Sequence, residues 1–148
     1  MGRKETLLVG HISKENIMQI TYTKETTIPV SEIGSRLEAA AKKQKFGVLN
    51  ETDLRGKMQS KGVDFKPQCM IFDVCNPNYA KMVLDSNIDI STALPCRISV
   101  YEDNGLTKVS TLLPTKVLNM FGTDGLDTIA QSVEKALVAI IDEVTSTE

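Results

Sequence analysis

Apolar and polar residues alternate along the stretch 17–26, where Met18, Ile20 and Tyr22 are separated by polar residues rich in Thr. This period of two is typical of a strand with one buried face. Apolar runs predict four further strands, at 46–52, 69–75, 94–101 and 107–113. The last two strands are joined by Asp103-Asn104-Gly105, which predicts a hairpin because Asn and Gly accept positive φ.

Between these strands, apolar residues recur at the spacing of a helix. Pro29 and Glu32 are typical of a helix start, and the pattern continues to about Gln44. Asp53 and Asn76 are placed to cap two shorter helices, and the second of these ends near Ser86. The buried side of that second helix is expected to carry Tyr79, Met82 and Val83.

The clearest amphipathic pattern lies at the end of the chain, after a short helical turn at 114–121. We expect Asp124 to cap this last helix. One stripe of it is apolar and predicts docking onto the sheet; it comprises Leu126, Ile129, Val133, Leu137, Ile140, Ile141 and Val144.

The predicted element order is β-α-β-(α)-β-α-β-β-α. One hairpin together with separated helices favours an α+β fold, with a mainly antiparallel sheet and helices packed on one face. The length of 148 residues fits a single domain. Residues 1–17 have no periodic pattern and are expected to be a leader or extension, with Met18 as an alternative start, while 18–148 form the domain.

Composition narrows the classes of partner. The net charge is -2 and Trp is absent, so neither a polyanion-binding field nor base stacking is indicated, and no nucleic-acid partner is expected. No apolar run approaches the roughly 18 residues of a membrane span, and none resembles a secretory signal. Three cysteines without CxxC spacing indicate reduced thiols. These features predict a cytoplasmic protein with no membrane partner.

Two short motifs place a cysteine beside a proline where elements meet. Cys75-Asn76-Pro77 ends a strand before a helix, and Pro95-Cys96-Arg97 begins a strand. If those strands are neighbours, both sulfur atoms face one crevice. The helix N-terminus and the Arg97 charge would then lower the pKa values of the thiols. The alternative is that both cysteines are buried as small apolar side chains.

Other groups of candidate residues do not fit a known type of metal or catalytic site. Cys69, Cys75 and Cys96 have no zinc-type spacing, and the one histidine, His11, precedes the domain, so no metal site and no histidine-based catalysis is selected. The acidic stretch 85–89 resembles a calcium loop but lacks the required Gly and Glu, which leaves a helix-ending turn.

Four motifs occur in an order that resembles one family: Phe46-Gly47-Val48-Leu49, Cys75-Asn76-Pro77, Leu94-Pro95-Cys96-Arg97 and Val100-Tyr101-Glu102. Over about residues 18–120 the chain is similar to the family named domain of unknown function 302. The resemblance implies a small α+β fold and, commonly, a homodimer, and it implies no activity. The family tends to have Gly where this chain has Lys45, and small residues where it has Asp73-Val74.

The sequence therefore predicts a small homodimeric binding or interaction domain, with no pattern that selects catalysis. Its ligand and cofactors are not indicated. The candidate ligand or thiol site comprises Cys75, Asn76, Pro77, Pro95, Cys96 and Arg97. One alternative is a redox or sulfur-handling protein that uses Cys75 and Cys96. Another is a metal or haem carrier.

Overall fold

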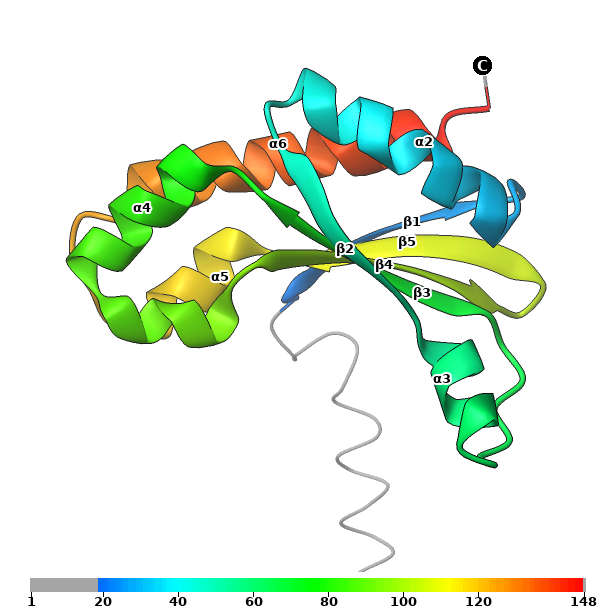
Figure 1. Ribbon diagram of the computed structural model, residues 1–148. Helices are drawn as coiled ribbons and strands as arrows, with labels where there is room; N and C mark the ends of the chain where they lie inside the picture. The colour runs from blue at the N-terminus through cyan, green and yellow to red at the C-terminus, as the bar shows by residue number, and fades with distance from the viewer. Residues whose placement is uncertain (1–18, 148) are drawn as a thin grey trace, which may run out of the picture.

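The computed structural model describes residues 19–147, which form a five-stranded antiparallel sheet with helices (Figure 1). The strands are β1 (Thr21–Thr26), β2 (Gly47–Asp53), β3 (Cys69–Cys75), β4 (Cys96–Asp103) and β5 (Leu106–Leu112), in the order β1-β5-β4-β3-β2. All four neighbouring pairs are antiparallel, so the predicted α+β class is confirmed. The expected leader and the start at Met18 lie outside the described residues.

Two long helices, α2 (Val30–Lys43) and α6 (Asp127–Thr145), lie on one face of the sheet (Figure 1). Because side chains alternate along a strand, the sheet presents Phe72, Val100 and Val109 to these helices, and all three are buried. The predicted stripe of α6 covers them, with Leu137 and Ile140 fully buried. No helix within residues 19–147 is long and apolar enough to cross a membrane.

The end of α2 explains why Gly is the more usual residue at the position of Lys45. The backbone N–H of Lys45 donates to the carbonyl of Lys42, and that of Phe46 donates to the carbonyl of Ala41. This is the Schellman arrangement, in which the residue after the helix adopts left-handed geometry. Lys45 has φ of 65°, a conformation that glycine adopts at lower cost. The lysine therefore stands where the backbone geometry favours Gly.

Three short elements pack together at one end of the sheet and are called the lobe. They are α4 (Pro77–Ser86), the 3-10 helix η1 (Ile88–Ala93) and α5 (Pro114–Asn119) (Figure 1). A second, smaller apolar cluster joins the lobe to the start of α6, through Val83, Ile90, Leu118, Leu126 and Ala130. At the other end, α3 (Leu54–Ser60) projects from the sheet, with the Asp53 carboxylate capping it at 2.9 Å from the Gly56 nitrogen.

Two local predictions are wrong. Asp124 does not cap the last helix, because Gly125 at φ of 82° turns the chain first and α6 begins at Asp127. Met82 is not on the buried side of α4: this residue is 50% exposed, and Val83 is the buried residue. The acidic stretch 85–89, expected to be a turn, leads into η1, where Asn87 caps the Asp89 amide at 3.0 Å.

Candidate functional site

The junction after β3 places Cys75 at the edge of the sheet facing the lobe. Asn76 stops the strand because its side-chain oxygen accepts from the backbone N–H groups of Asn78 (3.0 Å) and Tyr79 (3.1 Å). Pro77 follows at the first helical position, where a missing N–H costs nothing. The strand ends and α4 starts at these residues, as the motif predicts.

Cys96 reaches the same edge from the neighbouring strand. A cis peptide bond joins Leu94 to Pro95, and Cys96 then begins β4. β3 and β4 are hydrogen-bonded neighbours, and Cys96 is the register partner of Val74. Cys75 and Cys96 therefore lie at the same edge of the sheet, beside the lobe.

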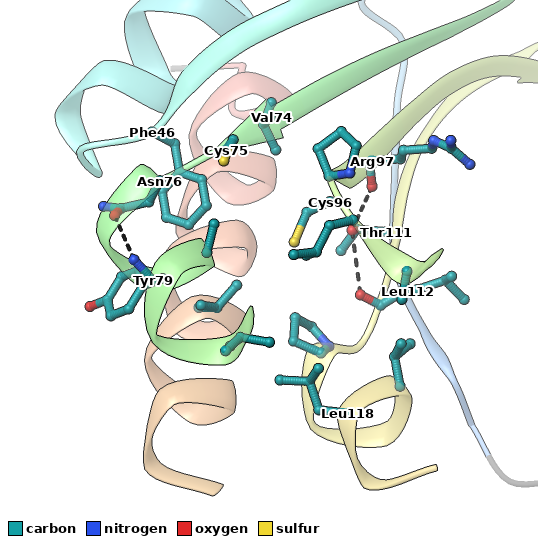
Figure 2. Close-up of a pocket in the computed structure, with 18 of the residues that line it drawn as sticks. Phe46, Val74, Cys75, Asn76, Tyr79, Cys96, Arg97, Thr111, Leu112 and Leu118 are labelled. Atoms are coloured by element: carbon teal, nitrogen blue, oxygen red, sulfur yellow. Dashed lines mark hydrogen bonds between the residues drawn. The ribbon is translucent and has the colours of Figure 1, made fainter. Parts of the chain in front are cut away.

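A pocket of about 230 Å³ lies between this edge of the sheet and the lobe (Figure 2). The sheet side contributes both cysteines, and α4, η1, α5 and α6 contribute most of the remaining wall. Its lining is Phe46, Val74, Cys75, Asn76, Tyr79, Ala80, Val83, Thr92, Ala93, Leu94, Pro95, Cys96, Arg97, Thr111, Leu112, Pro114, Val117, Leu118 and Val133. Most of these side chains are apolar.

The side chains of Asn76, Thr92 and Thr111 in the wall form hydrogen bonds with the protein itself. The Asn76 amide donates to the carbonyl of Lys45 at 2.9 Å, in addition to capping α4. The Thr111 hydroxyl donates to the carbonyl of Arg97 at 2.7 Å, and that of Thr92 to the carbonyl of Asp89 at 2.8 Å. A ligand in this pocket therefore meets few free hydrogen-bonding groups.

Both thiols have raised pKa values, whereas the interpretation as activated thiols requires lowered ones. Burial raises the pKa of Cys75 above its ordinary value. Burial, and secondly the charge that a Cys75 thiolate would carry, raises the pKa of Cys96 to about 11. The helix N-terminus does not favour a thiolate because Asn76 already occupies the amides of Asn78 and Tyr79. The cysteines are neutral wall groups at neutral pH, and the geometry gives no support to a thiol-dependent redox activity.

The Arg97 side chain is not directed at the sulfur atoms. Its Nε atom lies 3.2 Å from the Asp73 carboxylate, and Figure 2 shows the guanidinium pointing away from the cavity. Arg97 lines the pocket near its backbone carbonyl, which Thr111 binds. The expected effect of this charge on the thiols is therefore absent.

Five of the six candidate residues line the pocket, and Pro77 does not. Their functional role, and a joint role for the two thiols, stay predictions. The sequence missed the wall supplied by Val117, Leu118 and Val133, because these residues carry no motif and reach the pocket only through the packing of α5 and α6.

Metal binding has no support in the geometry either. Across residues 19–147, no three side chains of His, Cys, Asp or Glu lie close enough together to hold a metal ion. Cys69 does not line the pocket that contains Cys75 and Cys96. The hypothesis of a metal carrier therefore has no set of metal ligands to support it in this part of the chain.

The comparisons with known proteins agree with this architecture. The sequence model of the domain of unknown function DUF302 matches residues 22–144. The crystal structure of an uncharacterized conserved DUF302 protein from Bacillus stearothermophilus is similar, with 36% sequence identity and a TM-score of 0.82 over 87% of this chain and 100% of that one. No curated protein matches. The chain therefore belongs to the DUF302 family, whose function is unknown.

Proposed function

We propose that this protein is a small-molecule binding protein whose pocket takes an uncharged, largely apolar ligand. The observation that carries the proposal is the apolar pocket between the sheet edge and the lobe, with a volume of about 230 Å³. Pockets that bind small molecules are concave and mostly apolar, with few polar groups. No enzymatic step is needed for this function.

The absence of free charge in the wall supports a neutral ligand. Arg97 is the one lining residue that is charged at neutral pH, and its guanidinium pairs with Asp73. Both thiols are neutral, since burial raises their pKa values. A charged ligand would lose its hydration without gaining a partner, which is costly in an apolar site.

The test is a titration with 1-aminonaphthalene, a two-ring dye that is uncharged at neutral pH and whose fluorescence responds to apolar surroundings. We expect saturable binding at one site per chain. Ala80→Leu adds three carbon atoms to the pocket wall on α4 and should weaken binding at least about tenfold, which is about 1.4 kcal/mol. The matched control is Ala39→Leu, an exposed position on α2 away from the pocket.

Equal binding by the two variants would place the dye elsewhere and remove the proposal. The same result would follow if no saturable binding occurred in the unmodified protein. Both variants exchange an alanine for a leucine within a helix, so effects on helix propensity are matched.

A second proposal is that the protein is a homodimer through the face of the sheet that α2 and α6 leave uncovered. The centre of this face is weakly polar and uncharged: Thr23 and Ser110 share a hydrogen bond of 2.7 Å, and Ser99 and Ile71 continue the row through the register. Short side chains allow another sheet to approach at the usual spacing of about 10 Å.

Charge supports the same assembly. One end of this face has the ion pair of Asp73 and Arg97 at 3.2 Å. The other end has Lys108, which is 2.7 Å from Asp103 and is the register partner of Glu25. Because Asp73 neutralises Arg97, the excess charge lies at the Glu25 end, and a two-fold axis across the strands keeps the Glu25 ends of the two copies apart. Symmetric dimers are the commonest closed assemblies.

Light scattering at several concentrations tests the dimer. We expect twice the chain mass for the unmodified protein. Ser99→Glu places a charge at the centre of the face and should give the monomer mass, whereas Ser91→Glu, exposed on η1, should leave the dimer intact. A monomer at every concentration contradicts the assembly.

Two broader proposals concern the chain as a whole. A cytoplasmic location is supported by three cysteines that are all free thiols. Cell fractionation, followed with an antibody against the protein, tests this location.

We also propose that residues 1–17 are a dispensable extension of a single domain spanning 18–148. A chain beginning at Met18 should then keep its thermal midpoint, and a large drop would show that the extension docks on the domain.

A further inference from the structure

The wall of the pocket contains four polarizable groups, the rings of Phe46 and Tyr79 and the sulfur atoms of Cys75 and Cys96. From this we infer that the ligand is an uncharged aromatic molecule of one or two fused rings, rather than an acyl chain or another saturated hydrocarbon. The inference rests on the proposed function, because it names the chemical class of ligand for the same pocket.

The aromatic side of the wall is formed by Phe46 and Tyr79. Their ring centroids are 6.4 Å apart with planes inclined at 34°, an arrangement within the range of favourable aromatic pairs. Phe46 lines the pocket, and Figure 2 shows the Tyr79 hydroxyl pointing away from it. A planar ligand placed against Phe46 extends this pair, and an aromatic ligand gains more from the contact than a saturated one.

The sulfur side of the wall is formed by Cys75 and Cys96. Figure 2 shows the Cys96 sulfur pointing into the space between α4 and α5. Sulfur contacts with aromatic rings are favourable beyond simple burial, most often at the ring edge. Because burial keeps both thiols protonated at neutral pH, they offer soft contacts and no nucleophile. The wall thus favours a bound ring without a covalent step.

The size of the pocket agrees with a small ring system. A dry engineered cavity of about 150 Å³ binds benzene. The pocket here is larger, at about 230 Å³, and is partly open to solvent. One ring fits with space to spare, and two fused rings fill the additional volume.

The experiment compares indane with octahydroindene, which have the same carbon skeleton with and without an aromatic ring, by ligand-observed NMR titration. A featureless apolar cavity prefers octahydroindene, because the saturated molecule is the more poorly hydrated in water. We expect indane to bind more tightly. Tighter binding of octahydroindene overturns the inference and leaves the proposed function standing. No binding of either molecule overturns both.

Cysteine variants identify the source of the preference. Cys96→Val removes the sulfur while keeping a side chain of similar shape, and should weaken indane binding roughly twofold to tenfold without changing the affinity for octahydroindene. Cys69→Val is the matched control, since Cys69 is half-buried in β3 and does not line the pocket. Phe46→Leu should give the same split between the two ligands as Cys96→Val. An equal change for both ligands, or no change for either, overturns the inference.

Discussion

The two apolar clusters of this protein differ in the number of buried side chains that they contain. The larger cluster lies between the sheet and the pair α2 and α6, and includes fully buried side chains such as Phe72, Leu137 and Ile140. The smaller cluster lies under the lobe, and the 230 Å³ pocket lies beside it. The difference follows from element length. α2 and α6 have 14 and 19 residues and extend along the sheet, whereas α4, η1 and α5 have 10, 6 and 6.

Short elements bury few apolar groups each, so the lobe is also held by polar contacts. The Glu134 carboxylate of α6 accepts from the backbone and hydroxyl of Thr115, and Asn87 donates to Thr123 at 3.0 Å. The larger cluster therefore buries more apolar side chains, and the lobe, which lines the proposed ligand pocket, is expected to be the less stable part. Such a division is common, because ligand sites are drawn from the less stable parts of a fold.

The largest expected effect contrasts a leucine from each cluster. Leu137→Ala should lower the free energy of unfolding by about 2–5 kcal/mol, because Leu137 is fully buried in the larger cluster. Leu118→Ala should cost less, since Leu118 is 9% exposed and already borders the pocket. Denaturant melts measure both values. A cost for Leu137→Ala below roughly 0.5 kcal/mol would show that α6 is peripheral.

The next effect concerns the polar attachment of the lobe. Glu134→Ala removes the acceptor of two hydrogen bonds from Thr115, at 3.1 and 2.6 Å, and should cost about 2 kcal/mol. Hydrogen exchange should accelerate in α5 and stay unchanged in α2. The control is Gln131→Ala, an exposed change on the same helix. Uniform acceleration throughout the protein would show that the lobe has no separate stability.

A smaller effect appears only in alkali. Because burial raises the pKa of Cys96 to about 11, the folded protein holds this proton more tightly than the unfolded chain. Stability is therefore complete below pH 9, where both states are protonated, and is lost as pH rises from about 9 towards 11. At pH 10 the loss should be about 1 kcal/mol, and Cys96→Val should remove it. Melts of both proteins across this pH range make the measurement; parallel profiles would contradict the raised pKa.

The smallest effect is a gain. Lys45→Gly should raise the free energy of unfolding by about 0.5–1 kcal/mol, because Lys45 has φ of 65° and glycine adopts this geometry without strain. Lys42→Gly, within α2, should instead cost about 1 kcal/mol. Thermal and denaturant melts measure both. Opposite signs at two lysines only three positions apart would confirm that the backbone geometry, and not the charge, decides the outcome.

Local chemistry predicted most of the fold. The hairpin at Asn104-Gly105 has positive φ at both residues, and the Asp53 and Asn76 caps form as expected, because each depends on a few adjacent residues. The prediction that Asp124 caps the last helix is wrong. Asp124, a possible cap residue, is followed directly by Gly125, which turns the chain, and a local pattern does not show which of the two residues decides where the helix begins.

For the candidate site, the sequence determined which residues end the strands, and so placed Cys75 and Cys96 at element junctions. Only the tertiary structure decided their chemistry. Charge and helix position argued for reactive thiols, but the Arg97 side chain pairs with Asp73, Asn76 occupies the helix amides, and burial raises both pKa values. The pocket itself depends on Val117, Leu118 and Val133 arriving from distant segments, and long-range packing of this kind leaves no signal in a local pattern.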